Sequence, residues 1–167
     1  QIFDAAINRE VKAVWIIGED VVQTDPNSAH VAKAMNALDL LVVQEIFMSE
    51  TAKHADVVLP GTTFLEKDGT FTNTERRVQR VNKAAEPLKG TKPDGLIVTE
   101  MMQKLGYKQK PYDADEVLAE IADVVPFFKG ITRERLGKLG LQWPVKEDGT
   151  DTKILHEKEF KLGKGRI

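Results

Sequence analysis

The chain has 167 residues, of which 41% are hydrophobic and 30% are charged, and its formal net charge is −2. This length and composition are typical of one soluble globular domain with a packed core. The 24 basic side chains are balanced by 26 acidic ones, so the chain has no basic footprint for nucleic acid and we exclude nucleic-acid binding. It contains no cysteine, which excludes disulfides, cysteine-ligated iron–sulfur clusters and a thiolate nucleophile within it.

The apolar runs and the first residues bear on membrane insertion and export. The longest apolar runs, 13–17 and 40–43, are too short to cross a bilayer, so direct membrane insertion is not expected. No signal peptide is recognisable, which predicts a cytoplasmic location. The chain opens at Gln1 without Met, and processing or excision from a longer protein would explain this equally well.

The first two thirds of the chain alternate short apolar runs with helical stretches, a pattern typical of a parallel α/β sheet. The runs rich in β-branched residues predict buried strands at 11–17, 40–43 and 56–59. Helical spacing and start signals predict helices at 2–7, 29–38 and 49–54. We therefore expect a three-layer α/β/α Rossmann-like fold with a doubly wound, mostly parallel sheet.

The rest of the chain has a looser pattern. Residues 65–84 are mostly polar and predict a long functional loop with a hairpin. Further helices are predicted at 93–105, 114–124 and 132–139. From Leu141 onward the chain has the character of a connection rather than a core. We expect residues 1–140 to form the Rossmann-like domain and 141–167 to form a C-terminal connecting tail toward a following domain.

Polar residues follow each of the three predicted strands, at 18–20, 44–45 and 60–63. Ligands of open parallel sheets bind beyond the carboxyl ends of the strands. Carboxylates suit the N–H and amino groups of a purine, and amides and hydroxyls suit ribose and phosphate. Gly18 does not begin a G-x-G-x-x-G fingerprint and there is no Walker loop, so an ordinary NAD site is not expected. The pattern alone predicts a nucleotide-like ligand.

A long ordered run of residues is more specific. It comprises residues 50–60 (ETAKHADVVLP), 66–73 (EKDGTFTN) and 75–79 (ERRVQ). Over these segments the chain resembles the molybdopterin-guanine-dinucleotide oxidoreductases, the dimethyl sulfoxide reductase superfamily. The segments at 17–20 (IGED) and 142–144 (QWP) are similar to those of formate dehydrogenase catalytic subunits. The resemblance extends over nearly the whole chain.

The resemblance implies a fold, a ligand and contact residues. In the family this domain is Rossmann-like and binds one of two pterin dinucleotides, mainly at the guanosine end of that dinucleotide. Asp94 matches an acidic residue that recognises guanine, Lys67 would supply positive charge to the phosphates, and Thr24 would contact phosphate or ribose oxygens. The implied cofactor-binding residues are Gly18, Glu19, Asp20, Thr24, Gln44, Glu45, Thr63, Lys67 and Asp94.

Each assignment has a structural alternative. Gly18 would also serve a strand-to-loop turn, and Asp94 would also serve as a first-turn acid that the helix dipole favours. Thr24 and Lys67 would also fit a turn and a solvated surface. At least one of Arg76 and Arg77 is expected on a charged hairpin face rather than on phosphate. Packing or structural roles are expected for the tryptophans and histidines, namely Trp15, Trp143, His30, His54 and His156.

The resemblance also implies what lies outside this chain. In formate dehydrogenases of this type, a cysteine or selenocysteine ligates molybdenum or tungsten in an earlier domain, and an iron–sulfur cluster lies on an N-terminal motif. We therefore expect a fragment of a catalytic subunit that holds molybdopterin guanine dinucleotide, has no catalytic or metal-ligating residue of its own, and alone does not oxidise formate to CO2. Its expected partners are the other domains of that subunit and electron-transfer subunits.

Two alternative functions are open at this point. A cofactor-free structural relative, like the large subunit of respiratory complex I, would keep the fold without the molybdenum site. The segment 66–69 and Asp94 argue against it. A domain of a nitrate or other oxo-substrate molybdoenzyme would keep the class and change the substrate, and the segments 18–20 and 142–144 favour formate instead.

Overall fold

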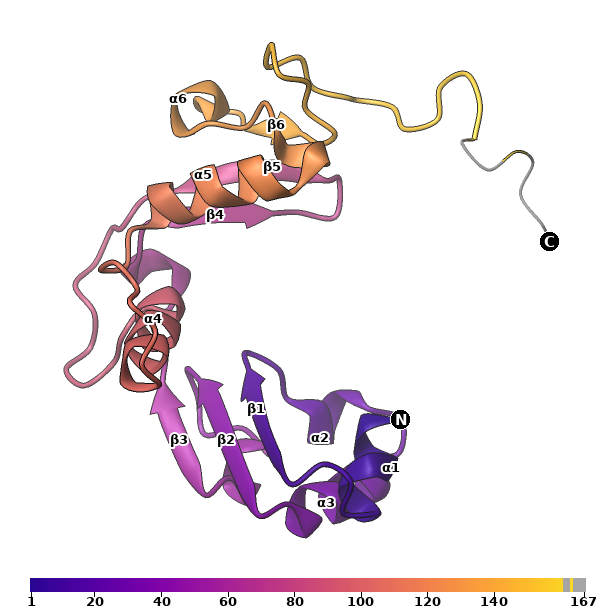
Figure 1. Ribbon diagram of the computed structural model, residues 1–167, viewed down its shortest axis with the longest axis vertical. Helices are drawn as coiled ribbons and strands as arrows, with labels where there is room; N and C mark the ends of the chain where they lie inside the picture. Colours follow the sequence, from indigo (N-terminus) through magenta and orange to yellow (C-terminus); the bar gives the residue numbers. More distant parts are fainter. Residues whose placement is uncertain (161–162, 164–167) are drawn as a thin grey trace. The chain divides into compact units, whose positions relative to one another are not determined.

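The computed structural model describes residues 1–160 and 163, and these residues form two compact units. The first unit comprises Gln1–Lys67 and Ala84–Pro111. The second comprises Asp68–Lys83 and the described residues from Tyr112 onward. Each unit has its own sheet and its own hydrophobic core (Figure 1).

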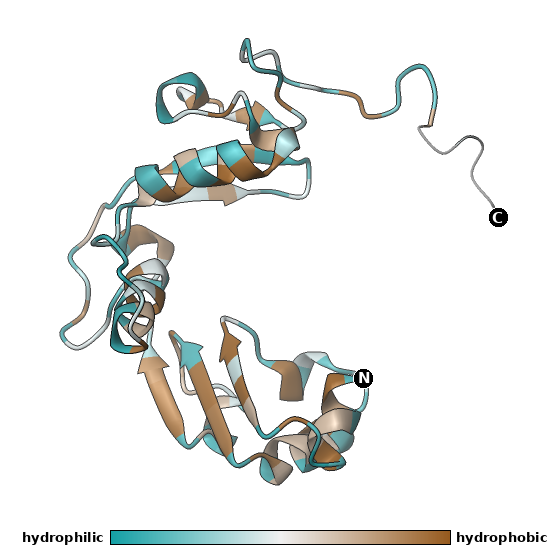
Figure 2. Ribbon diagram, viewed as in Figure 1, coloured by the Kyte–Doolittle hydropathy of each residue, from teal (hydrophilic) through white to brown (hydrophobic). Residues whose placement is uncertain are grey.

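A parallel sheet forms the centre of the first unit. Its strands are β1 (Ala13–Ile17), β2 (Leu40–Glu45) and β3 (Val57–Pro60), and they lie side by side in that order. Val43 of β2 is in register with Ile16 of β1 and with Val58 of β3. The β-branched composition explains the strands, because such residues pack well on a sheet covered by helices. Figure 2 shows β1 and β3 as mostly hydrophobic, whereas β2 ends in hydrophilic residues.

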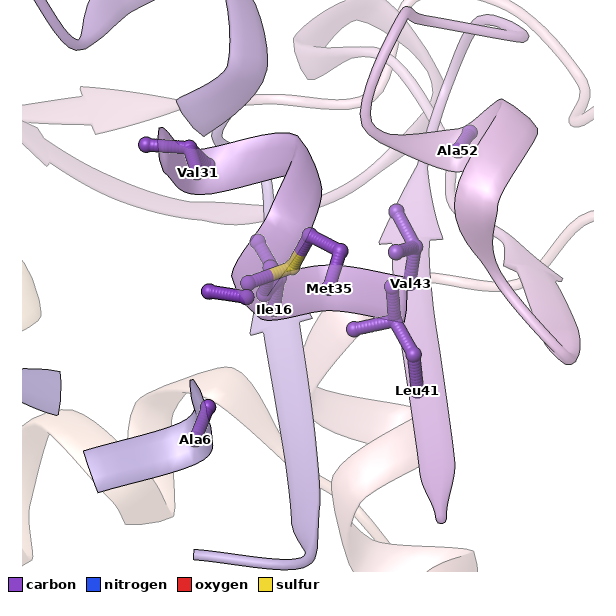
Figure 3. Close-up of a cluster of buried hydrophobic side chains, with 8 residues drawn as sticks. Ala6, Ile16, Val31, Met35, Leu41, Val43 and Ala52 are labelled. Atoms are coloured by element: carbon purple, nitrogen blue, oxygen red, sulfur yellow. The ribbon is translucent and has the colours of Figure 1, made fainter. Parts of the chain in front are cut away.

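Helices α1 (Ile2–Ile7), α2 (Val21–Thr24) and α3 (Ser28–Ala37) pack together beside this sheet. α3 begins after Asn27, whose side chain accepts a hydrogen bond from the His30 N–H at 3.2 Å. The apolar stripe of α3 faces the sheet because its apolar residues recur at helical spacing. The resulting core consists of Ala6, Ile16, Val31, Ala34, Met35, Leu41, Val43 and Ala52 (Figure 3).

The remaining elements of the first unit are the short 3₁₀ helices η1 (Ala52–His54) and η2 (Phe64–Glu66) and the longer α4 (Asp94–Lys104). The α/β class, the three parallel strands and the helix after Pro93 confirm the prediction from the sequence. The helix predicted at 49–54 is a single 3₁₀ turn. The Ser49 hydroxyl accepts from the Ala52 N–H at 3.1 Å, but the N-cap is Thr51 and Ala55 is already extended.

The second unit contains an antiparallel sheet of β4 (Gly69–Thr72), β5 (Arg77–Val81) and β6 (Leu141–Gln142). It also contains α5 (Ala114–Val124), η3 (Pro126–Phe128) and α6 (Arg133–Leu136). β4 and β5 are the hairpin predicted within 65–84. α6 is shorter than the helix predicted at 132–139 because Gly137 adopts a positive φ of 51°. The core is made of Val78, Leu118, Ile131, Leu136 and Val145.

The segment from Leu141 differs from the expected connecting tail. Leu141 and Gln142 pair with Val78 and Arg77 of β5, and Val145 is only 2% exposed. Residues 141–145 are therefore part of a core, and the expected boundary at residue 140 does not separate core from tail. Among the described helices, none is long and apolar enough to cross a membrane.

Candidate functional site

The carboxyl ends of the three parallel strands meet at one edge of the first unit's sheet (Figure 1). Two backbone hydrogen bonds join them beyond the regular ladder. The Gly18 N–H donates to the Gln44 carbonyl at 2.9 Å, and the Gly61 N–H donates to the Glu45 carbonyl at 3.1 Å. The three polar segments that the sequence places after the strands are therefore neighbours, as expected for parallel strands.

Three of the predicted contact residues form one cluster at this edge. The Gln44 side chain is fully buried at the end of β2, and its Nε2 donates to Asp94 Oδ1 at 2.8 Å. The other carboxylate oxygen of Asp94 accepts a short hydrogen bond from the Lys67 ammonium. Asp94 is the first residue of α4, where the positive end of the helix dipole favours a carboxylate. The cluster thus joins β2, α4 and the segment after η2.

The carboxylate of this cluster is held in its charged form. Burial raises the pKa of Asp94, but the hydrogen bonds from Lys67 and Gln44 and the positive charge of Lys67 lower it by more. The net effect is a pKa below the usual range for aspartate. At neutral pH the cluster therefore presents an anionic carboxylate beside an ammonium group.

Two buried polar atoms beside this cluster lack partners. Among the described residues, Gln44 Oε1 and Thr62 Oγ1 are buried and accept or donate no hydrogen bond. Gly61, which lies between β3 and Thr62, approaches the cluster closely: a Cβ there would lie 3.0 Å from Asp94 Oδ1. Buried polar atoms of this kind are normally hydrogen-bonded, and Trp15 Nε1 of β1 is a third such atom among the described residues, so these atoms are not confined to the strand-end edge.

The predicted residues after β1 form a second group, which is tied to the segment before η1. Asp20 accepts hydrogen bonds at Oδ1 from the Thr51 N–H at 2.9 Å and the Thr51 hydroxyl at 2.6 Å. The same hydroxyl accepts from the Val22 N–H at 3.0 Å. These bonds, above all that from the Thr51 side chain, hold the pKa of Asp20 below its usual range. The hydrogen bonds of Asp20 therefore link the start of α2 to residues 50–51.

Glu19 and Thr24 are exposed and bonded to each other, with the Thr24 hydroxyl 2.6 Å from Glu19 Oε1. Gly18 is exposed with a φ of +63°, so it makes the strand-to-loop turn. Glu45 Oε1 accepts from the neighbouring Ile46 N–H at 2.7 Å. These four residues lie at the same edge as the cluster but do not belong to it.

Thr63 takes part in a capping box at the start of η2. Its N–H and hydroxyl both reach Glu66 Oε2, at 2.8 and 3.0 Å. The other oxygen of Glu66 accepts from the Leu88 N–H at 3.1 Å. Through these bonds, Glu66 positions the segment that carries Lys67.

Three residues that hold this edge together were absent from the predicted set, namely Thr51, Gly61 and Glu66. Thr63 and Glu66 have the Thr-x-x-Glu spacing of a capping box, so a sequence signal existed for Glu66. Thr51 bonds Asp20 across 31 residues, and no local pattern reports such a pair. The same holds for the contact of Gly61 with Asp94.

Arg76, Trp143 and the three histidines have structural partners, whereas the buried Trp15 Nε1 has no hydrogen-bond partner among the described residues. Arg76 donates to the carbonyls of Trp143, Thr152 and Lys153, and its guanidinium lies 5.8 Å from the Trp143 ring centroid. Trp143 also packs beside Phe127 and Phe128. His30 and His54 contact Asp4 and Asn36, and His156 packs against Phe160. In residues 1–160 and 163, no group of three histidine or acidic side chains is arranged to hold a metal ion.

The first unit is thus an α/β unit with a cluster of polar and charged side chains at the carboxyl ends of its parallel strands. Residues 2–104 match the family model described as molybdopterin oxidoreductase. The chain belongs to the molybdopterin oxidoreductase family.

Curated relatives are similar over almost the whole chain. The chain is 46% identical to the F420-dependent formate dehydrogenase subunit alpha of Methanocaldococcus jannaschii over 161 residues, which are 95% of this chain and 24% of that protein. It is 43% identical to a putative formate dehydrogenase of Staphylococcus haemolyticus over 167 residues, 99% of this chain and 17% of that protein. The chain thus spans about a quarter or less of these relatives.

Among solved structures, acetylene hydratase from Pelobacter acetylenicus is similar, with a TM-score of 0.64 and 24% sequence identity. The similarity covers 80% of this chain and 19% of that one. At this identity the likeness concerns the fold alone. Since a hydratase and formate dehydrogenases are both similar to this chain, the fold does not by itself determine the reaction.

Proposed function

We propose that this chain is the domain of a molybdenum- or tungsten-dependent formate dehydrogenase catalytic subunit that holds the guanosine end of one molybdopterin guanine dinucleotide. Membership of the molybdopterin oxidoreductase family and the names of relatives at 43–48% identity support this proposal. The single observation that carries it is the cluster of Gln44, Lys67 and Asp94 at the strand ends. The nine predicted contact residues all lie on the unit that contains this edge.

The residues at this edge fit the proposed ligand chemically. Guanine presents N–H and amino donors, and an ionised carboxylate with its lone pairs accepts them. The absence of a side chain at Gly61 keeps the space next to Asp94 Oδ1 open. These features support a purine ligand with donor groups.

In the proposed parent enzyme, the cofactor metal supplies the redox chemistry that converts formate to CO2. The role of this chain is to bind and orient the nucleotide end. Asp94 accepts hydrogen bonds from guanine, Gln44 keeps the carboxylate in place, and the strand-end residues 18–20, Thr24 and Thr63 border the ribose and phosphates. The other domains of the subunit, an iron–sulfur cluster outside this chain and electron-transfer subunits complete the proposed enzyme in the cytoplasm.

The proposal is tested by titrating the 167-residue chain with GDP and ADP, followed by nuclear magnetic resonance. We expect weak binding of GDP, with shifts at Gly18, Gln44 and Asp94, and weaker binding of ADP. Asp94→Asn should abolish this preference, and Asp123→Asn, an exposed change in the second unit, should leave it unchanged. Shifts that map away from the strand ends would contradict the assignment. Formate oxidation by this chain alone would contradict the proposal that it only binds and orients the cofactor.

A second candidate is a structural relative that has lost the cofactor. The observation in its favour is that Asp94 and Lys67 compensate each other's charge without a ligand. Elemental analysis of the full-length protein separates the two functions. Molybdenum or tungsten in stoichiometric amount supports the enzyme, and absence of both supports the structural relative.

A further inference from the structure

The Lys67 ammonium contacts the carboxylate that is proposed to bind guanine, rather than a separate part of the strand-end edge. Its Nζ donates to Asp94 Oδ2, and its side chain is only 23% exposed. The carboxylate's other oxygen is held by Gln44. Lys67 and Asp94 therefore form an ion pair, and Gln44 holds its carboxylate in a fixed position.

This pairing conflicts with the role that family resemblance implies for Lys67, which is to neutralise the phosphates. The Watson–Crick edge of a guanine nucleotide and its phosphates lie at opposite ends, separated by the purine and the ribose. An ammonium in contact with the guanine-binding carboxylate cannot also contact the phosphates of that nucleotide. If Asp94 binds guanine, the Lys67 ammonium must contact the guanine base rather than the phosphates.

We propose that Lys67 reads the O6 atom of guanine while Asp94 accepts the N–H groups beside it, so that the ion pair determines specificity for the base. The inference rests on the proposed function, because it assumes that guanine lies at Asp94. Guanine has one acceptor, O6, next to two donors, N1–H and the N2 amino group. An ammonium next to a carboxylate presents the complementary pattern.

The hydrogen-bonding capacity of the pair allows this arrangement without breaking it. The Lys67 ammonium has three donor hydrogens and uses one on Asp94. The carboxylate has about four acceptor positions, of which Lys67 and Gln44 occupy two.

The same arrangement discriminates against other purines. Hypoxanthine keeps O6 and N1–H but lacks the amino group, so it loses one acceptor contact. Adenine carries an amino donor where guanine has O6, and an acceptor at N1. It would place a donor against Lys67 and a lone pair against Asp94, which leaves buried polar groups unpaired. The expected order of affinity is guanine, then hypoxanthine, then adenine.

The test compares ligands with and without phosphates. The 167-residue chain, Lys67→Met and Lys67→Arg are titrated with guanosine, GDP and ADP by nuclear magnetic resonance. We expect Lys67→Met to weaken guanosine and GDP by the same factor, on the order of tenfold, and to reduce the preference for GDP over ADP. Lys67→Arg, which keeps the charge and its donors, should retain most of the preference. Lys129→Met is the matched control, because Lys129 pairs with the exposed Glu147 in the second unit.

The outcomes separate this inference from the proposed function. Loss of GDP affinity with unchanged guanosine affinity would place Lys67 on phosphate and overturn the inference while keeping the guanine site. Unchanged affinity for both ligands in folded Lys67→Met would also overturn it. Failure of the unsubstituted chain to prefer guanine compounds at all would overturn the proposed function and, with it, this reading. Thermal unfolding of each variant confirms that the comparison is between folded proteins.

Discussion

Gln44 Nε2 lies 2.8 Å from Asp94 Oδ1, which links the end of β2 to the first residue of α4 across 50 positions of the chain. The amide is fully buried and the carboxylate is ionised, so this bond fixes a charge at the strand-end edge. It also gives the buried amide of Gln44, the next-to-last residue of β2, a hydrogen-bond partner. Lys67 contacts the other carboxylate oxygen, so that both oxygens of Asp94 are held in place.

Replacing the buried amide should therefore destabilise the first unit. Gln44→Leu keeps the volume but removes the donor to Asp94, and we expect the free energy of unfolding to fall by about 1–3 kcal/mol. Chemical denaturation at neutral pH measures it. Gln23→Leu is the control, because Gln23 is exposed, and it should change stability by less than about 0.5 kcal/mol. Equal effects of the two substitutions would show that the Gln44–Asp94 bond contributes little.

Thr51 should be more important for stability than its small size suggests. Its buried hydroxyl donates to Asp20 and accepts from the Val22 N–H, so Thr51→Val leaves a carboxylate and an amide each short of a partner. We expect a loss of about 1–3 kcal/mol in the free energy of unfolding. Thr24→Val is the matched change, since this exposed hydroxyl also donates to a carboxylate. A loss at Thr24 as large as that at Thr51 would refute the structural role of the Asp20–Thr51 contact.

Substitutions at Gly18 are expected to be limited by its backbone conformation rather than by lack of space for a side chain. Its φ is +63°, and no heavy atom lies within 4 Å of a Cβ built there. Gly18→Ala should therefore cost about 1–2 kcal/mol, the penalty of a left-handed conformation for a side chain. Gly18→Asn should cost less, because asparagine adopts this region more readily. Thermal unfolding of the two variants gives the comparison, and an Asn variant that is no better than the Ala variant would contradict the explanation.

Arg76 should stabilise the second unit and have no role in binding. Its guanidinium donates to three backbone carbonyls, and lysine cannot reproduce this planar set of donors. We expect Arg76→Lys to lower the stability of this unit by about 1–3 kcal/mol and to speed hydrogen exchange at the Trp143 amide. Arg80→Lys, at an exposed position of β5, serves as control. Weaker GDP binding by Arg76→Lys would instead support a phosphate contact.

Acid should weaken the first unit through its hydrogen-bonded carboxylates. The pKa values of Asp20, Glu66 and Asp94 are lower in the folded chain than usual. Groups with depressed pKa values stabilise the fold above their unfolded pKa, about 4, and lose this contribution as pH falls through the lower folded value. Stability should therefore be constant near neutral pH and should decrease below about pH 4. Denaturant titrations at several pH values measure the decrease.

The comparison with Asp20→Asn identifies the source of this acid sensitivity. The variant should be less stable than the original chain at neutral pH, and the difference should shrink as acid protonates Asp20 in the original. A difference that stays the same from neutral to acidic pH would mean that the Asp20 charge is not responsible.

The local sequence was sufficient to predict the parallel strands, the helices after Asn27 and Pro93, and the edge at which polar residues gather. These features depend on apolar periodicity and on the rule that parallel strands end at one side of a sheet. It could not predict that Leu141 and Gln142 form a strand, because a two-residue strand exists only through its partner β5. Nor could it limit α6 to Leu136, which depends on the conformation of Gly137.

Local spacing was enough to identify the chemical groups at the strand ends: the carboxylates, the amide, the hydroxyls and one ammonium. Their combination depends on the three-dimensional fold. It placed Lys67 on Asp94, Thr51 on Asp20 and Glu66 on Thr63, so that some predicted contact residues stabilise the edge and others form the ionised cluster. The physical reason is that the strength and direction of a hydrogen bond or an ion pair depend on distances across many residues, which no local spacing encodes.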